Sequence, residues 1–111
     1  MDKVQFHKFI CNRLNEIYRK KNADYGDSFA KVRELVPNAI IVRLMDKMER
    51  IKTLTKNGEQ AQVEDEKIED TLADMANYCI MELVERQAEK EAKMDNPYDA
   101  VELYSCLIKI M

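Results

Sequence analysis

Apolar residues recur every three or four positions along most of the chain, which is the spacing that places them on one face of an α-helix. The first stripe predicts a helix over residues 3–21, with an apolar face formed by Phe6, Ile10, Leu14 and Ile17. A second stripe predicts a helix over residues 38–56, with a core face formed by Ile41, Leu44, Met45, Met48 and Ile51.

Turn-forming residues separate these stripes. Residues 23–29 combine Asp and Gly around an aromatic residue and predict a tight loop, after which a short helix is expected over residues 28–35. Pro37 suits the first turn of the helix over 38–56, because the N–H that proline lacks has no partner there. The Asn57–Gly58 pair is typical of a helix end.

The rest of the chain predicts two more helices. Asp65 is a suitable N-cap for a helix that continues to about Lys93, and residues 95–97 interrupt it before a last helix over 97–111. The chain contains only 2 Gly and 2 Pro, so it has little capacity for hairpins. The expected fold is all-α: a small helical bundle of four long helices and one short helix, forming one domain over residues 1–111.

The helix expected after Asp65 contains an unusual segment. Nine of the twelve residues over 73–84 are apolar and surround the helix, which predicts burial on all sides. Asp74 and Asn77 interrupt the segment, and Asp70 lies one turn earlier on the same face. A buried carboxylate needs a cation, a metal or several donors. These three residues therefore form either a structural polar seam or a ligand site, for which Mg²⁺ is a suitable ion.

The helix over 38–56 carries the complementary charges. Its cations share one face, since Arg43, Lys47 and Arg50 are four and seven residues apart. The neutral interpretation is a solvated face with surface ion pairs. The functional interpretation is that Asp46 and Glu49 join Asp70 and Asp74 in holding a metal ion while the three cations bind phosphate.

The loop after the first helix supplies further candidates. It follows the cations Arg19, Lys20 and Lys21, and either Tyr25 or Phe29 is suited to stacking on a base. We take Lys21, Asp24 and Tyr25 as candidate substrate contacts. The alternative is a packed turn whose aromatic residues belong to the core.

Charge and cysteine content limit the partners. The net charge of −3 predicts no binding to polymeric nucleic acid or to a membrane. Cys11, Cys79 and Cys106 form no CxxC motif and no recognised cysteine–histidine pattern, so neither disulfides nor zinc are expected and the cytoplasm is the simplest location. We assign no ligand role to His7, the only histidine.

The apolar arcs of the first and last helices predict a homo-oligomer.

Three segments, residues 21–29, 43–51 and 63–78, resemble in order and spacing the nucleotide modification associated domain 1 family, small helical proteins common in phages and prophages. The resemblance covers about residues 20–82. It implies a nucleotide-handling protein of a bacterial or phage-infected cell, whose partner is a nucleotide or a nucleotide-derived small molecule.

The layout is also similar to that of all-α, MazG-type nucleotide pyrophosphohydrolases, which bind Mg²⁺ with an acidic pair on each of two helices. Asp46 and Glu49 correspond to the first pair, and Asp70 and Asp74 to the second. This likeness implies a Mg²⁺-dependent hydrolase of nucleoside triphosphates. The chain departs from that pattern, because it lacks the doubled glutamates and has cations among its acids.

Three functions therefore stay open: a Mg²⁺-dependent pyrophosphohydrolase, a non-catalytic protein that sequesters a nucleotide or nucleotide signal, and a helical protein–protein interaction module. The residues alone identify no catalytic group.

Overall fold

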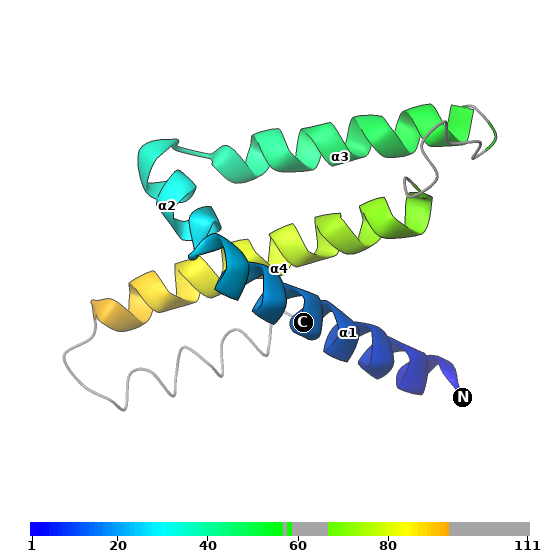
Figure 1. Ribbon diagram of the computed structural model, residues 1–111, viewed down its shortest axis with the longest axis horizontal. Helices are drawn as coiled ribbons and strands as arrows, with labels where there is room; N and C mark the ends of the chain where they lie inside the picture. The colour runs from blue at the N-terminus through cyan, green and yellow to red at the C-terminus, as the bar shows by residue number, and fades with distance from the viewer. Residues whose placement is uncertain (57, 59–66, 94–111) are drawn as a thin grey trace. The chain divides into compact units, whose positions relative to one another are not determined.

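The computed structural model describes residues 1–56, 58 and 67–93, and these residues form four helices and no strand (Figure 1). The helices are α1 (Lys3–Tyr25), α2 (Ser28–Leu35), α3 (Ala39–Lys56) and α4 (Ile68–Ala92). The predicted all-α fold is confirmed. The predicted helix over 97–111 and the predicted N-cap Asp65 lie outside the described residues.

The chain divides into two compact units, Met1–Cys79 and Ile80–Met111. The first unit contains α1, α2, α3 and the beginning of α4, and it holds every candidate residue for the site. In the second unit, the described part is the remainder of α4, where Arg86 Nε donates to Glu82 Oε2 one turn away at 2.6 Å. The prediction of a single domain over residues 1–111 stays a prediction.

Helix α1 has well-defined ends. Asp2 and Gln5 form a capping box, in which each side chain accepts a hydrogen bond of 2.8 Å from the backbone N–H of the other residue. The helix ends at Gly26, whose φ of 59° is left-handed and whose N–H donates to Asn22 O. The predicted end at residue 21 was wrong by four residues, because nothing in residues 22–25 prevents the helix from continuing until glycine permits the left-handed turn.

Helix α3 begins after a turn instead of at Asn38. Asn38 has a φ of 60°, a left-handed conformation that asparagine tolerates better than most residues, so the helix starts at Ala39. Pro37 therefore lies in the turn and not, as predicted, in the first turn of the helix. The boundaries predicted for α2 are confirmed. Helix α3 ends at Lys56, before the predicted Asn57–Gly58 helix end, and Gly58 is left-handed with a φ of 64°.

Two contacts show how α3 and the first part of α4 pair. Arg43 contacts Tyr78, and four residues later Lys47 contacts Asp74, four residues earlier on α4. Four residues toward the C-terminus of α3 therefore correspond to four residues toward the N-terminus of α4. The two segments run antiparallel, side by side, as Figure 1 shows for α3 and the neighbouring start of α4.

A small set of side chains is buried in the first unit. One or two come from each helix: Leu14, Phe29, Ala39, Leu54 and Thr71. The core face predicted for α3 was wrong in part. Ile41, Met45 and Met48 are exposed, with Met45 at 63 %, while Arg43 and Lys47 on another face are half-buried.

Helix α4 also differs from its prediction. The segment over 73–84 was expected to be buried on all sides, but its residues are half-buried or exposed, and Cys79 is exposed rather than packed. The prediction was wrong because apolar residues all around a helix allow every face to be buried but do not supply the neighbouring helices that would bury them. The described residues provide no helix to cover each of them. Of the helices in the described ranges, none combines the length and apolar character needed to cross a membrane.

The turn between α1 and α2 allows a paired test of backbone conformation. Gly26 and Asp27 are both left-handed, at φ 59° and 58°, and the Asp27 side chain makes no capping hydrogen bond. Gly26→Ala should lower the free energy of unfolding by about 1 kcal/mol, because alanine is strained in this conformation. Asp27→Gly should leave it unchanged or raise it. Thermal unfolding measures both, and a melting temperature that moves in the same direction in the two variants would contradict the assigned turn.

The predicted homo-oligomer stays a prediction, which exposed apolar side chains on α1 support. Val4, Phe6, Phe9 and Ile10 are all more than half exposed. We expect light scattering at roughly tens of micromolar protein to give a multiple of the chain mass. Ile10→Glu should weaken the association, whereas Lys8→Glu, on the polar side of α1, should not. A monomer under these conditions would refute the prediction.

Candidate functional site

Five side chains from three helices form a compact group in the first unit. Phe29 comes from α2, Arg43 and Lys47 from α3, and Asp74 and Tyr78 from α4. We call this group the α3–α4 cluster. The helix period explains it, because residues four apart on each helix share a face and the antiparallel pairing brings the two faces together.

The ion pair in the cluster joins Lys47 and Asp74. Lys47 Nζ lies 3.2 Å from Asp74 Oδ2, and the two side chains are 12 % and 41 % exposed. Asp74 therefore contacts one of the cations of the preceding helix. The Lys47 side chain is thus largely buried, while the Asp74 side chain reaches the surface. A cation held in this way interacts more strongly with a nearby anion than an exposed lysine does.

Arg43 lies against two aromatic rings. Its guanidinium carbon is 5.7 Å from the centre of Phe29 and 5.3 Å from the centre of Tyr78, and its Nη1 donates to the Tyr78 hydroxyl at 3.5 Å. The two rings stack with their centres 6.3 Å apart. Phe29 is only 6 % exposed, so its ring is held by the core. Cation–π attraction to the two rings then favours one position of the guanidinium.

Asn77 connects α4 to α1. Its Nδ2 donates to the backbone oxygen of Leu14 at 3.1 Å, and Leu14 is itself buried. This contact assigns Asn77 a structural function, since it positions the start of α4 beside α1. Its predicted contact with substrate stays a prediction.

The other candidate acids are not gathered at the cluster. On α3, Asp46 pairs with Arg50 at 4.0 Å and Glu49 pairs with Lys52 at 3.1 Å, both at the surface. Asp70 was expected inside the fold but is exposed. In the described part of the chain, no three side chains of His, Cys, Asp or Glu lie close enough together to hold a metal ion. Metal binding by Asp46, Glu49, Asp70 and Asp74 stays a prediction.

The loop candidates are at the surface. Lys21, Asp24 and Tyr25 are exposed at the end of α1, and Tyr25 is 67 % exposed. Phe29 is instead a core residue, which agrees with the packed-turn alternative for that ring. The contacts of Lys21, Asp24 and Tyr25 with a substrate stay predictions.

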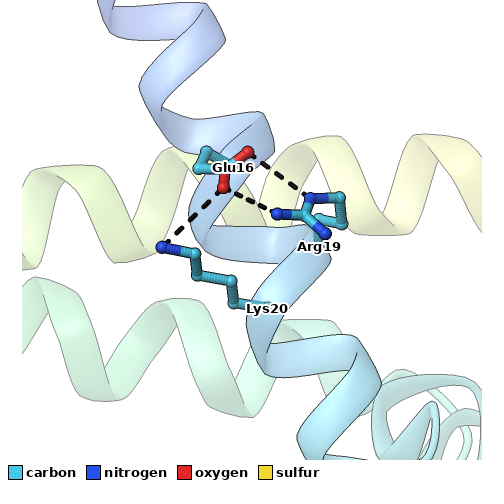
Figure 2. A network of polar contacts seen from close by, with 3 residues as sticks. All are labelled: Glu16, Arg19 and Lys20. Atoms are coloured by element: carbon cyan, nitrogen blue, oxygen red, sulfur yellow. Dashed lines mark hydrogen bonds and ion pairs between the residues drawn. The ribbon is translucent and has the colours of Figure 1, made fainter.

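A separate polar network lies on α1 and includes Arg19 and Lys20, two of the cations that precede the turn between α1 and α2. Figure 2 shows Glu16 between Arg19 and Lys20, with Oε1 at 2.8 Å from Arg19 Nη2 and 3.7 Å from Lys20 Nζ. The hydrogen bond from Arg19, and then its charge, lower the pKa of Glu16. The pair therefore adds stability above the ordinary glutamate pKa, and that stability is lost as the pH falls through the lowered value. The side chains are 43–68 % exposed, so the network is a surface feature of α1.

The sequence analysis did not predict that Tyr78 belongs to the site or that aromatic rings contact Arg43. The available signal was the four-residue spacing that puts Asp74 and Tyr78 on one face of α4, matching Arg43 and Lys47 on α3. His7 was assigned no ligand role from the sequence, and its Nδ1 lies 3.8 Å from the sulfur of Cys11.

Comparison with known families gives one finding. The family model described as nucleotide modification associated domain 1 matches residues 21–85, which is more than half of the chain. The match contains α2, α3 and the part of α4 that carries the cluster. Searches of curated proteins and of solved structures returned no match to the chain.

The Lys47–Asp74 pair predicts a coupled effect on stability. Asp74→Asn should lower the free energy of unfolding by about 1–2 kcal/mol, because it removes the counter-charge of a lysine whose side chain is largely buried. In a Lys47→Met background the same change should cost less than half as much. Urea unfolding of the four proteins in this cycle measures the difference. Asp46→Asn is the matched control, since the Asp46–Arg50 pair is at the surface and should contribute under about 0.5 kcal/mol. Additive effects of Lys47→Met and Asp74→Asn would contradict the pair.

Proposed function

The chain belongs to the nucleotide modification associated domain 1 family, and from this membership and the α3–α4 cluster we propose that it binds a nucleotide or a nucleotide-derived small molecule. The observation that carries the proposal is the position of Lys47. Its side chain is 12 % exposed and is held by Asp74 beside the stacked Arg43.

The cluster has the groups that phosphate recognition needs. Arg43 is fixed over two rings and directs one N–H to Tyr78, which leaves its remaining donors for phosphate oxygens. Lys47 adds a second cation one turn away on the same face. Two preorganised cations lose less freedom on binding than two mobile surface lysines would, so they support binding of a small anionic ligand.

The Asp74 carboxylate completes the recognition surface. It is 41 % exposed, and one of its oxygens is directed to Lys47. A carboxylate beside two cations disfavours a bare polyanion and favours a ligand that also presents hydrogen-bond donors, as the base and sugar of a nucleotide do. Asp74 thus contributes specificity, while Arg43 and Lys47 contribute affinity.

The arrangement of the acids does not favour a hydrolytic step. The acids proposed to hold Mg²⁺ do not fit such a site as they are arranged, because Asp46 and Glu49 pair with cations at the surface and Asp74 pairs with Lys47. A magnesium site would require these pairs to open. Binding without turnover, the sequestering function, is therefore our proposal.

We place the protein in the cytoplasm of a bacterial or phage-infected cell, where cysteines such as Cys11 and Cys79 stay reduced.

The proposal predicts binding that depends on the two cations of the cluster. A panel of nucleotides and modified nucleotides should include a ligand that releases heat in calorimetry and raises the melting temperature of the protein. Lys47→Met and Arg43→Lys should each weaken that ligand roughly 10- to 100-fold, as loss of a charged hydrogen bond implies. Lys52→Ala, which removes a surface cation of the same helix, should leave binding unchanged.

Two further readouts separate the alternatives. Pyrophosphate released by the wild-type protein with Mg²⁺ and a nucleoside triphosphate would replace sequestration with hydrolysis as the function. Absence of heat and of any melting shift across the panel would refute nucleotide binding and leave the helical interaction module.

A further inference from the structure

His7 and Cys11 form a pair of potential metal ligands on α1, away from the α3–α4 cluster. They are one helical turn apart, both are exposed, and Cys11 Sγ lies 3.8 Å from His7 Nδ1. No zinc site was expected from the sequence, because a histidine followed four residues later by a cysteine is not by itself a recognised zinc motif.

The distance between the two atoms suits a tetrahedral zinc ion. Zinc binds cysteine sulfur at about 2.3 Å and histidine nitrogen at about 2.0–2.1 Å, so at a tetrahedral angle the sulfur and nitrogen lie roughly 3.5 Å apart. The observed separation is close to this value. Because residues at i and i+4 share a helix face, both side chains reach one ion from a single rigid helix and need only a small rotamer adjustment.

The described residues of one chain supply only half of a structural zinc site. Such sites have four protein ligands, and the described residues bring no third His, Cys, Asp or Glu to this pair. A symmetric dimer with its two-fold axis beside the pair supplies the other half, since each copy contributes the same patch. Two cysteine thiolates would then neutralise the two positive charges of the ion.

The surroundings of the pair favour a second copy of α1 as that partner. All residues over 1–13 are exposed, and apolar Val4 and Ile10 lie on either side of His7 and Cys11 on the helix surface. Val4 is 80 % exposed and Ile10 is 53 % exposed. Contact between two copies along this face would bury these side chains and align the two half-sites at the same time.

We propose that His7 and Cys11 are one half of a zinc site that the same two residues of a second copy of this chain complete, joining two α1 helices through a two-histidine, two-cysteine centre. The inference is independent of the nucleotide-binding function, because it uses neither the α3–α4 cluster nor its ligands.

The test is titration of the full-length, reduced protein with Zn²⁺. We expect one zinc ion per two chains by elemental analysis, a loaded species that is at least dimeric by light scattering, and sulfur and nitrogen ligands in equal number by X-ray absorption. Co²⁺ should give the absorption of a tetrahedral thiolate site. One zinc per chain, a loaded monomer or a ligand set without sulfur would overturn the proposal.

Variants assign the site to the two residues. Cys11→Ser and His7→Gln should each abolish the binding and leave the helical signal in circular dichroism unchanged, because both side chains are exposed. Cys79→Ser is the matched control, since Cys79 is also an exposed free cysteine on a helix and the chain has no second histidine to pair with it. Cys106→Ser serves as the second control. Zinc binding that survives Cys11→Ser, or that is lost in Cys79→Ser or Cys106→Ser, would overturn the assignment.

Discussion

The positive charge of Lys47 lies on a side chain that is only 12 % exposed, in the contact between α3 and α4. An ammonium group in such a place is costly unless a carboxylate or several acceptors reach it. Asp74 is that carboxylate, and it is available only when α4 lies antiparallel to α3 in one register. The same register puts Tyr78 beside Arg43. A slip of one turn would separate the ion pair, so this single contact specifies how the two helices meet.

The pairing has a consequence for the rest of α3. Because a polar face with two cations is directed toward α4, the Ile41, Met45 and Met48 face is left exposed. Long cationic side chains make this arrangement stable, since their methylene stems pack against neighbours while their charged ends find Asp74 and the aromatic rings. The exposed Ile41, Met45 and Met48 face therefore takes no part in the core of the first unit.

The cluster connects this packing with the family. The matched segment contains the helices that build the ion pair and the stacked arginine, while most of α1 lies before it. The two candidate sites therefore differ in their relation to the family: the α3–α4 cluster lies within the matched segment, and the His7–Cys11 pair lies outside it on α1. Asn77 links them mechanically, because its hydrogen bond to Leu14 holds α1 against the start of α4.

Local chemistry in the sequence was sufficient to predict which described segments are helical, although not where α1 ends or α3 begins. The period of the apolar residues, the left-handed glycine after α1 and the few helix-breaking residues determine an all-α chain, because each depends only on neighbours along the chain. The four-residue spacings also placed Arg43 with Lys47, and Asp70 with Asp74, on shared faces. Which face turns inward was decided only by tertiary structure. Periodicity favoured Met45 and Met48, but the Lys47–Asp74 pair and the stacking of Arg43 depend on where a second helix lies, which no spacing within one helix can specify.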